Sequence, residues 1–324
     1  MDNEQENPTT EPVKPEWERK VLEQLAFAAL NEQKTTRRWG VFFKLLAFSY
    51  FVALLLIVAY PNFESEMSSN GQHTAVVDVL GMIAEGESAN AHAIITGLRN
   101  AASNKNTKGI ILNINSPGGS PVQAADVYDE IKRLKTLHPD LPIYSVVGDI
   151  CASGGYYIAA ASDKIFVNQA SLIGSIGVVM NGFGFTHVLE KLGIERRLLT
   201  AGEHKAMLDP FLPVKSQETK HMQSLLDQVH QQFIRAVRDG RGQRLKETEA
   251  PEMFSGLVWT GSEGVRLGLA DGFGSVDSVS REVFGVEDQV NFTPQEHLMD
   301  RLAGKFGTAF GHSVTTLLPS AQVQ

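Results

Sequence analysis

Cysteine is nearly absent from this sequence, because Cys151 is the only one in 324 residues. One cysteine cannot form an internal disulfide, and it excludes a zinc site built from cysteines. The nine histidines include no HExxH motif, so a second common zinc pattern is missing as well. A basic surface is missing too. The formal net charge is −8 and Lys and Arg form no cluster, which argues against nucleic acid as the main partner.

One long apolar run is present near the N-terminus. Residues 41–60 contain a single charged residue, Lys44, close to their start. The run matches the roughly 20 residues that a helix needs to cross a bilayer. Basic residues precede the run and acidic residues follow it, namely Lys34, Arg37 and Arg38 before it and Glu64 and Glu66 after it. By the positive-inside rule, we predict a single transmembrane anchor over residues 37–60, with the bulk of the chain outside the cytoplasm.

Two other interpretations of this run are open. A cleaved signal peptide has a shorter apolar region and ends at a small-x-small site, whereas the sequence YPNF, residues 60–63, follows here. A buried core helix would leave the charge asymmetry unexplained. We therefore expect an uncleaved anchor between a cytoplasmic arm, residues 1–36, and a polar linker, residues 61–73. The cytoplasmic arm carries Trp17, Val21, Leu25 and Ala28 at the spacing of a short amphipathic helix.

The remaining chain predicts an α/β domain over residues 74–290. Strands are expected over 74–79, 108–114, 142–148 and 164–168, and helices over 89–103, 121–137, 216–239 and 262–269, with another helix directly after Ser153. Alternation of this kind favours parallel strands with helical crossovers. The C-terminal tail, residues 291–324, places Leu298, Leu302, Phe306 and Phe310 on one helical face, which we interpret as an oligomer contact, with membrane-surface binding as the alternative.

Two glycine-rich segments follow predicted strands and indicate a reactive site. The segment NSPGGS, residues 115–120, offers backbone N–H groups that no side chain obstructs, as an oxyanion hole requires. The segment CASGGYY, residues 151–157, places Ser153 at a strand end before a helix. Ser153 is a candidate nucleophile, with a plain N-cap as the alternative. Cys151 is the rival nucleophile, but its place inside the strand favours packing in the core. The segment is not a G-x-S-x-G elbow, because position 151 is not glycine.

A serine nucleophile needs a base, and two neighbouring residues are candidates. His204 would form a Ser-His-Asp arrangement with Asp149 or Asp209 as the orienting carboxylate. Lys205 would act instead if apolar neighbours desolvated it, since desolvation disfavours its charged form. The segment TAGEHKAMLDPF, residues 200–211, supplies such neighbours.

Four motifs make this chain resemble the SppA-type signal peptide peptidases from about residue 74 to residue 283. They are NSPGGS (115–120), GDICASGGYYIAAASDKI (148–165), GSIGV (174–178) and GEHKAMLDPF (202–211), and the stretch FSGLVWTGSEGVRLGLADGFG (254–274) also matches. The resemblance implies a Clp protease/crotonase-like fold of stacked ββα units behind one transmembrane helix. It also implies a membrane-anchored serine protease of the short bacterial form, with its catalytic domain on the periplasmic side of the inner membrane.

The resemblance also implies roles for individual residues. Ser153 would be the nucleophile and Lys205 the general base, while Ser175 would help to hold the lysine. The N–H groups of Gly119 and Gly154 would form the oxyanion hole. Cys151 and Ile150 depart from the small or apolar residues common in the family. No cofactor or metal is implied, and the expected partners are peptide substrates such as signal peptide remnants, the membrane, and copies of the same chain in a homo-oligomeric ring.

Two rival functions remain for such a sequence. A crotonase-type acyl-CoA enzyme would share the fold and the oxyanion hole, but it would use acidic residues and would not need an anchor. A non-catalytic membrane scaffold would keep the fold and lose the dyad, yet Ser153 and Lys205 are both present. Peptide hydrolysis by the wild type and by variants at these two positions separates the three functions.

Overall fold

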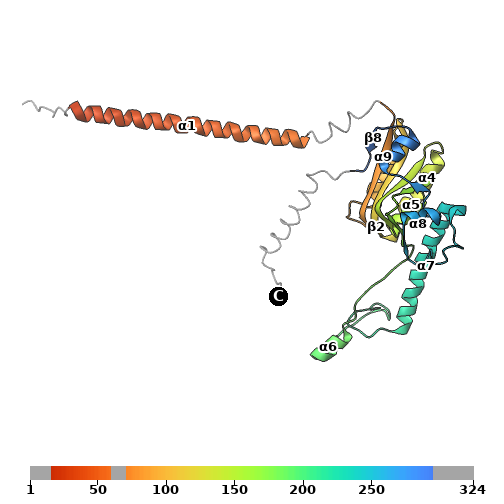
Figure 1. Cartoon of the computed structure of the whole chain (residues 1–324). Coiled ribbons are helices and arrows are strands. Elements are labelled where there is room, and N and C mark those ends of the chain that lie inside the picture. Colours follow the sequence, from red (N-terminus) through yellow and green to blue (C-terminus); the bar gives the residue numbers. More distant parts are fainter. Residues whose placement is uncertain (1–15, 60–70, 295–324) are drawn as a thin grey trace, which may run out of the picture. The chain divides into compact units, whose positions relative to one another are not determined.

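The computed structural model describes residues 16–59 and 71–294, and the chain divides into two compact units, residues 1–67 and 68–324. The elements are α1 (Glu16–Ala59), β1 (His73–Ile83), α3 (Ala91–Ser103), β2 (Thr107–Gly119), α4 (Pro121–Leu137), β3 (Ile143–Ala152), α5 (Gly154–Ala160), β4 (Lys164–Val167), β5 (Leu172–Gly174), α6 (Thr186–Leu192), α7 (Ser216–Arg241), η1 (Gly242–Arg244), β6 (Val258–Thr260), α8 (Gly261–Arg266), β7 (Gly272–Phe273), α9 (Val276–Ser278), η2 (Val279–Phe284) and β8 (Gln289–Asn291) (Figure 1).

The first unit contains one long helix, α1. The short helix expected around Trp17 and the apolar run expected to begin a separate anchor are parts of this one continuous helix. Among the residues that the structure describes, no helix combines the length and the apolar character that a membrane crossing needs. The predicted anchor, residues 37–60, ends at Tyr60, outside the described residues, so the anchor stays a prediction. Most of the predicted linker also lies outside them.

The second unit is built on one mixed sheet with the strand order β6-β5-β3-β2-β1-β8. Most neighbouring strands are parallel, whereas β5 and β6 are antiparallel. Strand β3 pairs with β4 through Tyr144–Val146 and then with β5 through Ile150–Ala152. The α/β class expected from the sequence is confirmed, with parallel strands in the centre of the sheet.

Helices and strands share a large apolar core in this unit. Alternate residues of β1 and β2 are completely buried, and apolar positions of α3, α4, α5 and α7 pack against them. A smaller cluster around Ile111, Val146 and Val279 lies apart from the main core. The two clusters explain the apolar runs of the sequence, because the central strands bury side chains on both faces of the sheet.

Strand β2 is longer than the sequence predicts. We expected it to end before a Pro-Gly-Gly turn, but pairing continues to Gly119, which lies opposite Ile83 of β1. Gly118 and Gly119 have φ angles of 100° and 154°, which residues with a Cβ atom rarely adopt. The glycines therefore prolong the strand in a conformation that other residues would not accept.

Residues 178–215, called the arm below, leave the sheet after β5 and return at the start of α7 (Figure 1). The arm is ordered by contacts of its own. The Phe185 ring stacks on the Phe211 ring with centroids 5.5 Å apart, the Phe185 N–H donates to the carbonyl of Pro210 at 2.7 Å, and Arg196 pairs with Asp209 at 3.1 Å. Helix α6 within the arm has no buried residue.

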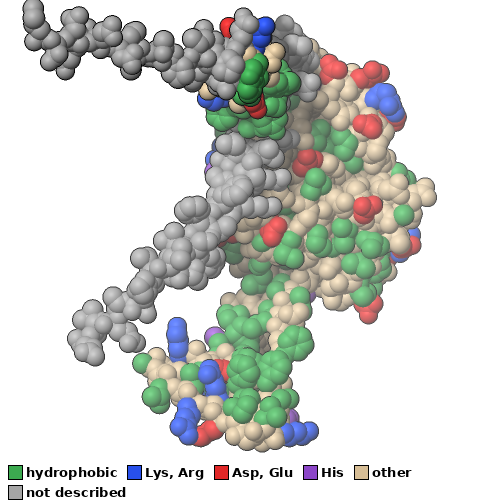
Figure 2. Space-filling view, turned by 90° about the vertical axis from the view of Figure 1, so that its left-hand side faces the viewer, with side chains coloured by type: hydrophobic (Ala, Val, Ile, Leu, Met, Phe, Trp, Pro, Cys, Tyr) green, Lys and Arg blue, Asp and Glu red, His purple; other side chains and the backbone are tan. Residues whose placement is uncertain are grey.

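The arm exposes many large apolar side chains. They are Val179, Met180, Phe183, Phe185, Val188, Leu192, Ile194, Leu198, Leu199, Phe211 and Val214. Figure 2 shows hydrophobic side chains gathered on the lower lobe together with Lys and Arg. The C-terminal residues proposed as an oligomer contact, Leu298 to Phe310, lie outside the described residues.

Candidate active site

Ser153 stands between the end of β3 and the first residue of α5. Its backbone has φ 51° and ψ −122°, a region that residues other than glycine seldom occupy. Its N–H donates to the carbonyl of Gly174 at 2.8 Å, and its own carbonyl accepts from the N–H of Tyr157 at 2.9 Å. Ser153 occupies the N-cap position of α5, but its side chain makes no capping hydrogen bond to the helix. The strained backbone therefore presents a hydroxyl that the helix does not use.

The glycines at the end of β2 lie directly against Ser153. A Cβ atom on Gly118 would stand 2.7 Å from the amide nitrogen of Gly154 and 2.7 Å from the Cβ of Ser153. A Cβ atom on Gly119 would overlap the carbonyl oxygen of Ile83. A Cβ atom on Gly154 would lie 3.2 Å from the amide nitrogen of Gly119, so the two predicted oxyanion-hole residues are neighbours. Only glycine allows this close approach of two backbones.

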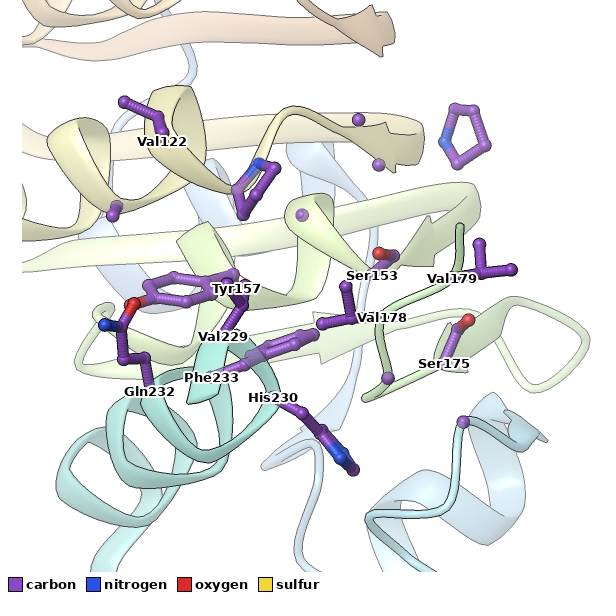
Figure 3. Close-up of a pocket in the computed structure, with 18 of the residues that line it drawn as sticks. Val122, Ser153, Tyr157, Ser175, Val178, Val179, Val229, His230, Gln232 and Phe233 are labelled. Carbon is purple, nitrogen blue, oxygen red and sulfur yellow. The ribbon is translucent and has the colours of Figure 1, made fainter. Parts of the chain in front are cut away.

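Ser153 and Ser175 line one cavity of about 860 Å³, together with Gly118, Gly119 and Gly154. Ser175 is half-buried and has φ 50°, and its N–H donates to the carbonyl of Leu257 at 2.8 Å. Figure 3 shows Ser153 and Ser175 at one end of the cavity beside Val178 and Val179, and Tyr157, Gln232 and Val122 at the other end. The structure thus brings together four of the five predicted site residues.

Lys205 is the predicted site residue that the structure does not bring to this cavity. It lies in the arm, its side chain is exposed, and it is not among the residues that line the cavity. Among the described residues, none forms the apolar enclosure expected around Lys205, because the large apolar side chains of the arm are exposed. Desolvation of this lysine therefore needs a contact that the described residues do not provide.

The Ser-His-Asp alternative is not formed. His204 is exposed on the arm beside Lys205 and does not line the cavity. The N–H of Phe211 and the guanidinium of Arg196 bind the Asp209 carboxylate and lower its pKa. Asp149 instead accepts a hydrogen bond from the side chain of Asn115 at 3.2 Å. Neither carboxylate is paired with His204.

Cys151 packs beneath the site, as the sequence predicts. Its side chain is completely buried in the main core, and burial raises the pKa of its thiol. A buried neutral thiol is a poor nucleophile, since the thiolate is the reactive form. The rival assignment of Cys151 as nucleophile is therefore wrong.

His230 lines the cavity and was not identified from the sequence. It comes from α7, and its Nε2 lies 3.0 Å from the carbonyl oxygen of Ile176, which follows Ser175. The partners are 54 positions apart, and the sequence shows only that Val229 and Phe233 have the spacing of one helix face. No short motif could have indicated this contact.

Comparison with known proteins gives two family matches. The model for peptidase family S49 matches residues 135–288, and the model for Clp protease matches residues 74–173. A protein of Synechocystis sp. that carries a protease name is 30% identical over 208 residues, which are 64% of this chain and 72% of that protein. A protein of Enterococcus faecium that carries the name signal peptide peptidase SppA is 34% identical over 200 residues, 60% of this chain and 57% of that protein.

A third relative carries a different name. A Brucella abortus protein named Na(+)/H(+) antiporter NhaA is 40% identical over 205 residues, 63% of this chain. The match spans only 27% of that protein, so the antiporter name, which is given to the whole protein, carries no argument about the matched segment.

Proposed function

The chain belongs to peptidase family S49, and we propose that it is a serine endopeptidase that hydrolyses apolar peptides. The observation that carries this proposal is the Ser153 hydroxyl, which the positive φ angle holds at the cavity and which makes no capping bond. The cavity around it is lined largely by apolar side chains, including Met82, Val178 and Phe233. An apolar peptide segment fits such a lining. Remnants of cleaved signal peptides are the natural substrates that we propose.

The chemistry proceeds through an acyl-enzyme. Ser153 Oγ attacks the peptide carbonyl while Lys205 Nζ takes the hydroxyl proton, and the lysine returns this proton to the leaving amine. The N–H groups of Gly119 and Gly154 hold the oxyanion that forms on the carbonyl oxygen. Water then hydrolyses the ester, with the same lysine as base. Ser175, at the same end of the cavity, orients the lysine ammonium or amine through its hydroxyl.

Lys205 reaches Ser153 of a neighbouring copy in a homo-oligomeric ring in this proposal. Support comes from the exposure of Lys205 and from its absence in the lining of its own chain's cavity. The exposed apolar side chains of the arm also support assembly, because a patch of this kind marks an interaction surface. Contact with the next copy would bury these side chains and exclude water from Lys205.

The N-terminal helix anchors the ring in the bacterial inner membrane, with the peptidase unit on the periplasmic side. Between Trp39 and Leu54, α1 exposes large apolar residues at positions 41, 42, 43, 45, 46, 48 and 51. Successive helix residues are about 100° apart, so these side chains surround the helix. Apolar side chains all round this part of α1, followed in the sequence by the apolar residues 55–60, support the proposed anchor. Protease added to spheroplasts should digest the unit after residue 67, and protection of that unit would refute this orientation.

A fluorogenic apolar peptide tests the activity and the source of the lysine together. We expect Ser153→Ala and Lys205→Ala each to be inactive, while the control variants Ser103→Ala, exposed at the end of α3 and outside the cavity lining, and Lys191→Ala, on the arm, keep the wild-type rate. Equal amounts of the two inactive variants, unfolded and refolded together, should recover about a quarter of the wild-type rate, because a quarter of the sites combine both intact residues from neighbours.

The outcomes of this mixture are distinct. No recovery on mixing would show that Ser153 and Lys205 act within one chain. Full activity of Ser153→Ala would refute the proposed nucleophile. A wild type that cleaves no peptide would favour the scaffold, and turnover of an acyl-CoA thioester in its place would favour the crotonase-type enzyme.

A further inference from the structure

His230 makes a hydrogen bond that joins α7 to the loop after β5. Its Nε2 lies 3.0 Å from the carbonyl oxygen of Ile176. A carbonyl oxygen only accepts hydrogen bonds, so Nε2 carries the proton and donates it. The histidine is half-buried at the rim of the cavity that contains Ser153. Figure 3 shows its ring turned away from Ser153, so the geometry gives it no direct part in proton transfer to that hydroxyl.

The loop that receives this bond is tied to the nucleophile. The carbonyl of Gly174 accepts the N–H of Ser153 at 2.8 Å, and the N–H of Ser175 donates to Leu257 at 2.8 Å. The side chain of Ile176 is completely buried, which fixes the residue that bonds to His230. Residues 174–176 therefore make contacts with β3, with the segment before β6 and with α7. Among the described hydrogen bonds of residues 174–176, only the bond from His230 comes from α7.

The same bond closes the base of the arm. The arm begins directly after Gly177 and ends where α7 starts at Ser216. Ile176 lies two residues before the arm and His230 lies about four turns into α7, so their bond fixes the chain that leads into the arm against the helix that follows it. Lys205 is carried by the arm, and the direction in which the arm leaves the sheet decides where this lysine can reach.

We propose that His230 is a positioning residue that holds Ser175 and the base of the arm in the geometry for catalysis. The proposal rests on the proposed peptidase function. The proposed role needs a hydrogen-bond donor at the position of Nε2. An apolar side chain such as Phe233, which also lines the cavity from α7, has no such donor. A loosened base would let Ser175 and Lys205 drift from Ser153, and small displacements of catalytic groups cost rate.

Three substitutions at one position test this proposal. His230→Gln places an amide nitrogen near the position of Nε2, His230→Asn places one near Nδ1, and His230→Phe keeps a ring without a donor. We expect His230→Gln to keep kcat within about twofold, and the other two to lose roughly tenfold in kcat, as loss of one buried hydrogen bond predicts. KM should stay within about twofold, because the change affects the reacting groups rather than peptide binding.

The matched control is His221→Phe, an exposed histidine on the same helix, which should behave as wild type. Three outcomes would overturn the proposal: wild-type kcat in His230→Phe, equal rates for His230→Asn and His230→Gln, or a change confined to KM.

Hydrogen exchange of the amides of residues 174–179 provides a readout that needs no activity. Exchange should accelerate roughly tenfold in His230→Phe and stay near wild type in His230→Gln, while the melting temperatures of both variants stay close. Unchanged exchange in His230→Phe would refute the proposal that the His230 hydrogen bond holds this loop. If the wild type cleaves no peptide, the peptidase function fails, and the exchange result still decides whether His230 holds the loop.

Discussion

A comparison of Gly118→Ala with Gly86→Ala separates the cost of a positive φ angle from the effect of displacing the proposed nucleophile, Ser153. Gly118 has φ 100°, and a new Cβ atom would stand 2.7 Å from the Gly154 nitrogen and 2.7 Å from the Ser153 Cβ. Gly86 has φ 84° with nothing within 4 Å of such an atom, so Gly86→Ala carries the angle cost alone. That cost is about 1–2 kcal/mol. Because an ordinary contact needs about 3.4 Å or more, Gly118→Ala must also push the Ser153 backbone away by several tenths of an ångström.

The two variants should differ in activity far more than in stability. Misplacement of a reacting group by about 1 Å can cost roughly a hundredfold in rate, so we expect Gly118→Ala to lose between about tenfold and a hundredfold in kcat/KM. Gly86→Ala should keep kcat/KM within about twofold while losing about 1 kcal/mol in the free energy of unfolding. Peptide hydrolysis and urea unfolding measure the two quantities. A folded Gly118→Ala with the activity of Gly86→Ala would refute the steric reasoning.

Three further predictions concern the fold, the buried thiol and the arm. Hydrogen bonds from Arg133, opposed in part by burial, and then from Arg99 lower the pKa of Glu130 to about 2. Since the unfolded value is about 4.3, the stability that Glu130 adds is complete above about pH 5 and is lost as the pH falls toward 2. Glu130→Gln should therefore cost roughly 2 kcal/mol at pH 7 but little near pH 2 in urea titrations, whereas the exposed control Glu263→Gln should cost under about 0.5 kcal/mol; equal costs at both pH values would contradict this. Cys151 should resist iodoacetamide in the folded chain and react in urea, as mass spectrometry would show, and rapid labelling of the folded chain would contradict its burial. Leu199→Asp should abolish assembly in sedimentation without lowering the melting temperature of the single chain, because this side chain is 99% exposed, and an intact ring would remove the arm from the interface.

The sequence predicted the sheet unit well because its signals are local. Apolar runs predicted the central strands, and Pro121 at the start of α4 marked a helix beginning where the structure has one. The end of β2 was predicted wrongly, because the pairing of Gly119 with Ile83 joins segments 36 positions apart, and glycine is usually read as a turn signal. The continuity of α1 was missed because a change in polarity was taken as a change of element.

The site was predicted in part, for a related reason. Ser153 and the glycines are identified by short motifs at strand ends, where parallel strands bring such residues together. His230 is not, since its partner Ile176 is a backbone carbonyl that any residue could supply. The enclosure of Lys205 was predicted from apolar neighbours in the sequence, but those neighbours need a surface to pack against. The residues that the structure describes do not supply that surface.

The outward-facing arm gives the proposed enzyme a built-in dependence on its own concentration. A chain that has just been made carries the nucleophile in one place and exposes its lysine in another, so it would be inert toward the proteins around it. Dilution below the dissociation constant of the ring would switch hydrolysis off, and return to higher concentration would restore it without any chemical change. The proposed membrane anchor would favour the active form, since it would confine the copies to two dimensions and raise their local concentration. Proteolysis would then begin only where enough copies have gathered.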